Sequence, residues 1–249
     1  MGLKVPYLPD AEIEASATTL LTRFSRAEAV QVRPPIDLDA LLVHLGLRLD
    51  FDDLKAILGI PDALGALWVK EQHIYIDQTL DPDERPGALG RFRFTLAHEI
   101  GHWSLHRSLF LLKDLQDDLF RKSPEPSIVC RTSQRREPIE LQADAFAAAL
   151  LMPKPAVAAF WQRLMGSADR LKVSELKDRA GPFLVAAALL GRGCASRDAR
   201  SQQNAVIEAA IWPLAEAFEV SPAAMRIRLE QLGFIVHEVD TTVSMFEAG

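Results

Sequence analysis

Two histidines four residues apart, with a glutamate directly after the first, lie in the segment RFRFTLAHEIGHWSLH. On a helix, His98 and His102 lie one turn apart on the same face, so both imidazoles can reach one metal ion. Glu99 projects from an adjacent face, where a carboxylate can take a proton from water without binding the ion. The spacing therefore predicts two ligands and the general base of a hydrolytic zinc site. The alternative is a structural pair of histidines on a buried helix.

A catalytic zinc site needs a third protein ligand. His106 lies one further turn along the same helix, which would strain the spacing, so we interpret it as a surface or supporting histidine. Cys130 could supply a thiolate, but we expect it to be a free cysteine. Glu140 and Asp144 lie one turn apart on a later segment, PIELQADAFAAALL, whose burial would be costly for an uncompensated carboxylate pair. We therefore predict Glu140 as the third ligand and Asp144 as the hydrogen-bond partner of a ligand histidine.

Two helices must hold these side chains. Apolar residues occupy several faces of the segment 89–106, which is typical of a buried helix. We expect the second helix to begin at Pro138 and to end before Pro153, because proline suits a first turn and stops a helix. Small residues would let the second helix pack closely against the first; these are Ala143, Ala147 and Ala148.

The rest of the chain predicts a mostly helical α+β fold. LRLDF (47–51) alternates like a short strand, and the runs 65–70 and 73–77 (GALWVK and HIYID) predict a hairpin in a small antiparallel sheet. We expect Asp10 to cap a first helix, and we expect a second helix to open at Pro35.

Composition limits the class of protein. The chain has 249 residues and a net charge of −6, which argues against a surface that coats nucleic acid. Its two cysteines indicate a reducing compartment. The N-terminal segment has acidic residues where a signal peptide needs an apolar core, and the apolar run FLVAAALL is far shorter than the roughly 20 residues that cross a bilayer. We expect a cytoplasmic protein with no membrane segment.

The helix with HEIGH, followed by IELQADAFAAALLMP, closely resembles the ImmA/IrrE family of bacterial zinc metallopeptidases. The resemblance extends to the N-terminal region and to FEVSPAAMRIRLEQLG near the C-terminus. It implies a gluzincin-like fold with His98, His102 and Glu140 on zinc and Glu99 as the base. It also implies a substrate class, namely Xre-type helix-turn-helix repressors that are cut to release stress, mobile-element or toxin–antitoxin genes.

On this interpretation, residues 1–165 form the metallopeptidase domain. Residues 166–204, which look longer than the family pattern, are an insertion or linker. Residues 205–249 form a helical region that resembles a helix-turn-helix, in which Ser221 caps the second helix.

The expected reaction is metal-assisted hydrolysis of an amide. Zinc is the preferred ion, although manganese or iron in the same ligand set is chemically reasonable. Tyr75 and His73 are our candidates for stabilising the oxyanion. The hairpin that contains them either offers an edge for an extended substrate or has only a structural role.

Two other functions stay open. In a DNA-binding regulator, Arg226 and Arg228 would reach phosphates or base edges from the second helix of the C-terminal pair. Glu230 sits beside them and the chain is acidic, so we favour a packing or repressor-docking role for this helix pair. The remaining interpretation keeps the metal but not proteolysis, and makes the protein a toxin–antitoxin or regulatory partner that acts by binding.

Overall fold

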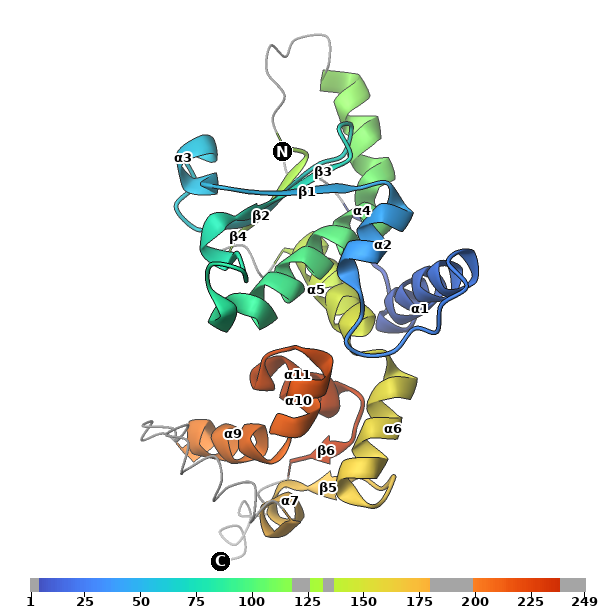
Figure 1. Cartoon of the computed structure of the whole chain (residues 1–249), viewed down its shortest axis with the longest axis vertical. Helices are drawn as coiled ribbons and strands as arrows, with labels where there is room; N and C mark the ends of the chain where they lie inside the picture. The colour runs from blue at the N-terminus through green and yellow to red at the C-terminus, as the bar shows by residue number, and fades with distance from the viewer. Residues whose placement is uncertain (1–4, 118–125, 132–136, 180–198, 238–249) are drawn as a thin grey trace, which may run out of the picture. The chain divides into compact units, whose positions relative to one another are not determined.

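The computed structural model describes residues 5–117, 126–131, 137–179 and 199–237 (Figure 1). The chain divides into two compact units, Met1–Pro153 with Ala217–Val220, and Lys154–Glu216 with Ser221–Gly249. The division falls at Pro153 rather than at the predicted residue 165, because helix α6 (Lys154–Met165) packs within the second unit. Its Trp161 is fully buried there, and the indole lies 5.5 Å from the ring of Phe234.

The described part of the first unit contains both helices and strands. The helices are α1 (Asp10–Ala27), α2 (Leu38–Leu45), α3 (Leu54–Leu58), α4 (Leu89–Asp117) and α5 (Pro138–Leu151), with short 3-10 turns at Gln78–Leu80 and Pro86–Ala88. The strands are β1 (Arg48–Asp52), β2 (Ala63–Trp68), β3 (His73–Asp77) and β4 (Ile128–Arg131). The fold is therefore α+β and mostly helical, as predicted.

The strands form one sheet in the order β1-β3-β2-β4. The predicted hairpin is confirmed, since β2 and β3 pair antiparallel. The sheet as a whole is mixed rather than antiparallel, because β1 runs parallel to β3. After β1 the chain forms α3 and then β2, which runs opposite to β1. Strand β3 follows β2 and lies between β1 and β2 in the sheet, parallel to β1.

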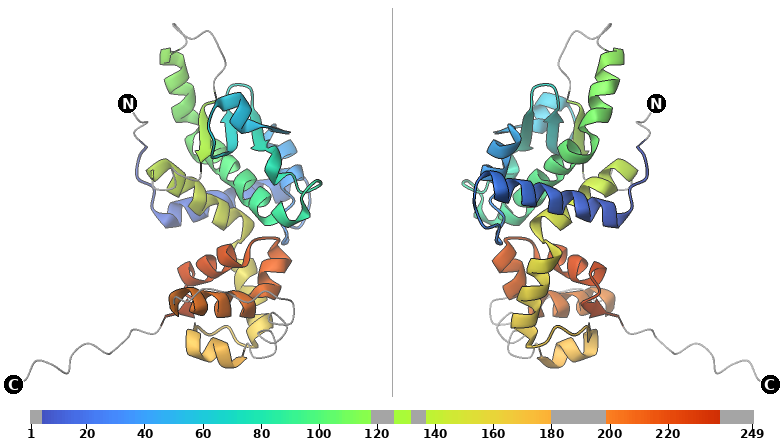
Figure 2. Two further views of the ribbon diagram at one scale, coloured as in Figure 1. Left: turned by 90° about the vertical axis from the view of Figure 1, so that its left-hand side faces the viewer. Right: turned by 90° about the vertical axis from the view of Figure 1, so that its right-hand side faces the viewer.

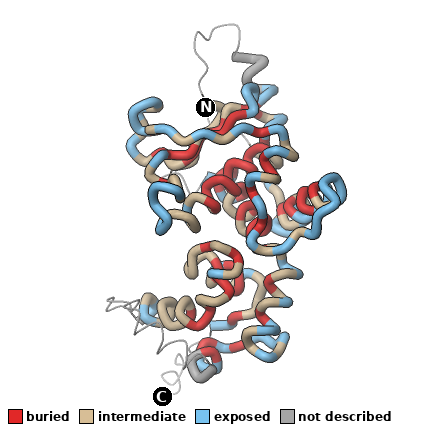
Figure 3. The backbone as a smooth tube through the Cα atoms, in the orientation of Figure 1, coloured by how far each residue is buried: buried red, intermediate tan, exposed pale blue. Residues whose placement is uncertain are grey.

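Helices cover both faces of this sheet. Along each strand the side chains alternate between the faces. The face of Ile74 and Ile76 is fully buried and lies over α4, whereas Ala66 packs with Leu54 of α3 on the opposite face. Figure 2 shows α4 running beneath the strands with α5 beside it, and Figure 3 shows that the middle of α4 is buried. The prediction that the HEIGH helix is buried on all sides is confirmed, since residues 95–103 are all buried.

Local chemistry explains the helix ends, including two that we predicted wrongly. Helix α2 begins at Leu38, after Pro35, because the side chain of Asp37 accepts a hydrogen bond from the backbone N–H of Ala40 at 2.9 Å. In α1, Asp10 is the first helical residue and makes no capping bond; a carboxylate in the first turn instead interacts favourably with the helix dipole.

The described part of the second unit is mainly helical. Besides α6 it contains α7 (Val173–Arg179), α9 (Ala199–Ala210), α10 (Trp212–Phe218) and α11 (Pro222–Gln231), with short parallel strands β5 (Leu171–Lys172) and β6 (Ile235–Val236). The predicted cap is confirmed: the N–H of Ala224 donates to Oγ of Ser221 at 3.1 Å. Residues 180–198 of the predicted insertion lie outside the described part of the chain.

Among the described residues, no single helix is long and apolar enough to cross a membrane. Only α5 and α6 taken together reach the required length and composition, and the chain bends at the break between them. Most of α5 is buried within the first unit.

Candidate metal centre

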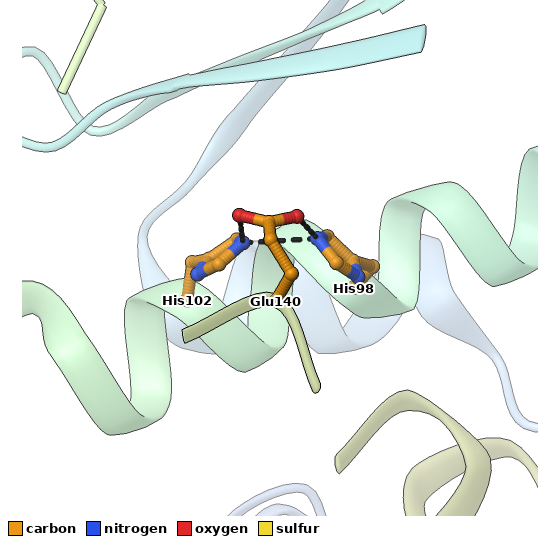
Figure 4. Close-up of side chains that lie close together, drawn as sticks. All are labelled: His98, His102 and Glu140. Carbon is orange, nitrogen blue, oxygen red and sulfur yellow. Dashed lines mark hydrogen bonds and ion pairs between the residues drawn. The ribbon is translucent and has the colours of Figure 1, made fainter. Parts of the chain in front are cut away.

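Helices α4 and α5 bring the three predicted ligands together (Figure 4). Nε2 of His98 lies 2.9 Å from Nε2 of His102. The two carboxylate oxygens of Glu140 lie 3.1 Å from Nε2 of His98 and 3.4 Å from Nε2 of His102. All three side chains are at most 3% exposed. The carboxylate therefore spans the two imidazoles inside the unit.

This donor set fits a divalent metal ion. Ligands about 2.1 Å from a tetrahedral zinc ion lie about 3.4 Å from one another, which is within about half an ångström of the distances of 2.9, 3.1 and 3.4 Å between these side chains. The ligand atoms of His98, His102 and Glu140 all lie within 4.8 Å of one another. Two imidazoles and one carboxylate also match the ligand types that such ions prefer. The cluster could therefore hold one metal ion.

Close packing of α4 on α5 depends on Gly101. A β-carbon added there would lie 3.2 Å from the carbonyl oxygen of Ala143 and 3.3 Å from Cβ of Phe146. The small residue between the two histidines thus lets α5 approach until Glu140 reaches them. The predicted role of Ala143 as a small contact residue of α5 is confirmed.

Glu99 is completely buried, and neither of its carboxylate oxygens has a hydrogen-bond partner in the described part of the chain. Gly65 of β2 lies directly against it, since an added β-carbon would be 2.6 Å from Oε1 of Glu99. Burial is the main reason that the pKa of Glu99 is raised to about 8; the charge of His98 opposes this shift, and the charge of Glu140 adds to it. A buried carboxylate without a partner is costly unless water or an ion meets it.

Asp144 and His106 support the two histidines from behind. Nδ1 of His98 donates to Oδ1 of Asp144 at 2.9 Å, as we predicted for a supporting carboxylate. Nδ1 of His102 lies 3.1 Å from Nδ1 of His106, which is 1% exposed and therefore not a surface residue. Such contacts select the tautomer and the orientation of a ligand imidazole.

Our sequence reasoning missed Gln142, which continues the contact beyond His106. Nε2 of His106 donates to Oε1 of Gln142 at 2.9 Å, and Nε2 of Gln142 donates to the carbonyl oxygen of Pro6 at 2.8 Å. Gln142 lies two residues from both Glu140 and Asp144, so it does not share their one-turn helical spacing. The sequence pattern therefore gave no reason to select it. The chain of bonds ties the N-terminal segment to the site.

The pKa values show how the cluster is charged without a metal. Burial alone would raise the pKa of Glu140, but hydrogen bonds from His102 and His98 lower it to about 2. Burial lowers the pKa of His102 to about 4 despite its bond to Glu140. For His98 burial acts in the same direction, but hydrogen bonds with Asp144, Cys130 and Glu140 raise its pKa well above the usual value. At neutral pH, Glu140 is ionised and His102 is neutral, which are their ligand forms.

Cys130 is a free cysteine, as predicted, and lies on β4 beside the same site. Its Sγ, a ligand atom of His98 and a carboxylate oxygen of Glu99 all lie within 4.8 Å of one another. Burial raises the pKa of the thiol, whereas the contact with His98 acts in the opposite direction.

The structure does not bring Tyr75 and His73 to the site. Both project from the face of β3 opposite to that of Ile74 and Ile76, so the sheet separates them from Glu99. Nε2 of His73 lies 2.6 Å from Oδ2 of Asp50, and its ring stacks on Tyr75. Strands β2 and β3 are also both interior to the sheet, so the predicted hairpin offers no free edge. The edge strand next to β2 is β4.

Arg226 of α11 pairs with two carboxylates of the second unit. Nε of Arg226 donates to Glu208 and Nη1 donates to Glu230, both at 3.0 Å. Arg228 is only 5% exposed. In the alternative of a DNA-binding regulator, Arg226 would have to leave these carboxylates to reach a phosphate.

The family model of the IrrE N-terminal-like domain, a peptidase family, matches residues 73–230. The match begins at β3, includes α4 and α5 with the whole ligand cluster, and ends in α11. No curated protein matches the chain.

Proposed function

The chain belongs to the peptidase family of the IrrE N-terminal-like domain, and we propose from this membership and from the site that it is a zinc metalloendopeptidase. The observation that supports the proposal is that two groups of side chains lie next to each other. One is the His98, His102 and Glu140 cluster, which could hold a metal ion. The other is the buried, unpartnered carboxylate of Glu99 beside it.

When bound, zinc supplies the Lewis acidity that activates water and polarises the scissile carbonyl. Side chains of the protein transfer the proton and orient the ligand imidazoles. Oε1 or Oε2 of Glu99 takes the proton of the attacking water and returns it to the leaving amine. Asp144 and His106 contact Nδ1 of His98 and Nδ1 of His102, so that Nε2 of each imidazole faces Glu140 and would be available to hold the ion. The sheet above α4 excludes bulk water from the carboxylate.

The substrate that we propose is an Xre-type helix-turn-helix repressor, cut within the cytoplasm to release the genes that it represses. Support for this substrate comes from the resemblance of HEIGH and IELQADAFAAALLMP to the ImmA/IrrE motifs. The free thiol of Cys130 suits a reducing compartment. An extended substrate segment would pair with β4, the edge strand nearest to the site.

The experiment compares the wild type with Glu99→Gln, which removes the base but keeps its size. Exposed Glu84 offers the matched control Glu84→Gln. Metal content is measured in all three proteins, which are then incubated with helix-turn-helix repressors encoded beside the gene. We expect one zinc per chain in each protein and a single cut in a repressor only with the wild type and the control.

Stoichiometric metal without cleavage of any repressor by the wild type would contradict the proposed substrate and would favour a protein that acts by binding. A wild type without metal under zinc-replete conditions would contradict the metallopeptidase as a whole. Cleavage by Glu99→Gln at the rate of the wild type would exclude Glu99 as the base.

A further inference from the structure

Tyr75 and His73, which the metal centre does not use, line a pocket on the other face of the sheet. Tyr75 pairs with Ala66 of β2, and Ala66 packs against Leu54 of α3, so these side chains share the face opposite to α4. The pocket has a volume of about 300 Å³, which is at the lower end of the range for ligand sites. The sheet therefore separates a small second pocket from the metal centre.

The walls of this pocket combine aromatic, apolar and charged side chains. The rings of Trp68 and Tyr75 lie 5.0 Å apart, edge to face, and the ring of His73 stacks on Tyr75. Apolar side chains come from α3, and charged side chains come from β1 and from the turn between β2 and β3. The apolar pair is Leu54 and Ile57, and the charged set is Arg48, Asp52 and Glu71.

The charges at the pocket favour a cation. Asp52 and Glu71 are both exposed, and Nη2 of Arg48 donates to the carbonyl oxygen of Glu71 at 3.2 Å. Nε2 of His73 lies 2.6 Å from Oδ2 of Asp50, a further carboxylate of β1. Among these described residues, carboxylates outnumber arginines, and the faces of aromatic rings also attract cations.

We propose that this pocket binds the side chain of an arginine in a protein partner. The planar guanidinium would stack on the ring of Trp68 or Tyr75 and donate to the carboxylates at the rim. The methylene groups of the arginine would cover Ile57, which is 53% exposed. Each kind of lining side chain thus has a counterpart in a single arginine.

The lining distinguishes this occupant from other cations. Lysine carries a compact, strongly hydrated ammonium group, which lacks the plane and the five N–H donors of a guanidinium. Free arginine brings its own α-carboxylate, which the acidic rim would repel, whereas an arginine within a peptide chain has no such charge. The inference goes beyond the proposed peptidase activity and does not depend on a metal ion, since the pocket contains none of the three ligands.

NMR titration of the full chain labelled with nitrogen-15 tests the pocket, with the indole N–H signal of Trp68 as the reporter. The signal is assigned by its absence from the spectrum of Trp68→Phe. The probes are arginine with an acetylated amino group and an amidated carboxyl group, and the equally capped citrulline, which is neutral and nearly the same shape. We expect the arginine probe to shift the Trp68 signal, and the citrulline probe to bind at least about tenfold more weakly.

Two pairs of variants test the lining residues. Asp52→Asn removes a charge from the pocket, and Glu84→Gln removes an exposed charge elsewhere. Tyr75→Leu removes an aromatic face that Tyr75→Phe keeps. We expect affinity for the arginine probe to fall about two- to fivefold in Asp52→Asn and Tyr75→Leu, and to stay unchanged in the two controls. The dispersion of each spectrum verifies that the variant is folded.

A Trp68 signal that does not respond to the arginine probe would overturn the inference, and so would equal affinities for the arginine and citrulline probes. Equal binding of capped lysine would overturn the assignment to a guanidinium. Tighter binding of free arginine than of the capped probe would overturn the choice of a protein partner. These outcomes leave the metallopeptidase proposal intact, because metal content and repressor cleavage test that proposal separately.

Discussion

Gly65 lies so close to Glu99 that a β-carbon added to the glycine would be 2.6 Å from Oε1 of the glutamate. Strand β2 thus has no side chain where it crosses the proposed base. The carboxylate fills the space that a side chain would occupy, and it faces the sheet without a hydrogen-bond partner in the described part of the chain. The position of the base is therefore set by contact between a strand and a helix.

Gly65→Ala tests this contact. The new methyl group forces Glu99 out of its position, because real β-carbons do not approach other atoms so closely. We expect peptide cleavage to fall at least about tenfold, with zinc content unchanged because no ligand is touched. The control is Gly87→Ala, where an added β-carbon meets nothing within 4 Å. Full activity of Gly65→Ala would contradict the proposed position of the base.

Gly101→Val tests the approach of α4 to α5. Its side chain would meet the backbone of Ala143 and Cβ of Phe146, which a small shift cannot avoid. We expect a loss of roughly 1–3 kcal/mol in the free energy of unfolding and weaker zinc binding as Glu140 moves away. Urea denaturation and competition with a chelator measure the two effects. Gly101→Ala should be milder, since its added contacts are at 3.2–3.3 Å and alanine favours a helix.

Asp144→Ala removes the carboxylate that accepts from Nδ1 of His98. We expect zinc affinity to fall about 10–100-fold, the usual effect of losing a group that orients a ligand histidine. Asp144→Asn should lose less, because its amide oxygen can still accept the bond. Competition with a fluorescent chelator measures the affinities. Equal affinity in the wild type and Asp144→Ala would show that Asp144 does not orient His98.

The pH dependence of the metal-free protein tests the raised pKa of Glu99. The unfolded chain releases this proton near pH 4.5 and the folded protein near pH 8, so ionisation opposes folding between these values. The wild type should lose stability as pH rises through this window. We expect the free energy of unfolding of Glu99→Gln, relative to the wild type, to rise by roughly 3–5 kcal/mol between pH 4 and pH 9.

Urea denaturation in the presence of a chelator provides this comparison, and the difference between the two proteins cancels titrations that they share. Exposed Glu84→Gln should show no such trend. A difference that stays constant with pH would contradict the raised pKa.

Local spacing was sufficient for the parts of the site that lie within one helix. His98, Glu99 and His102 follow from helical periodicity, which fixes the relative directions of side chains three or four residues apart. The ends of α5 at Pro138 and Leu151 also followed from local rules, because proline acts on its own backbone.

Contacts between segments that are distant in the sequence could not be predicted from local spacing. Strand alternation showed that His73 and Tyr75 share a face, but the helix that covers that face was decided by packing, which placed α4 on the other side. Likewise, the register of β4 on β2 brings Cys130 opposite Gly65. Register and crossing geometry depend on how apolar surfaces fit together across the whole unit, and no short stretch of sequence contains that information.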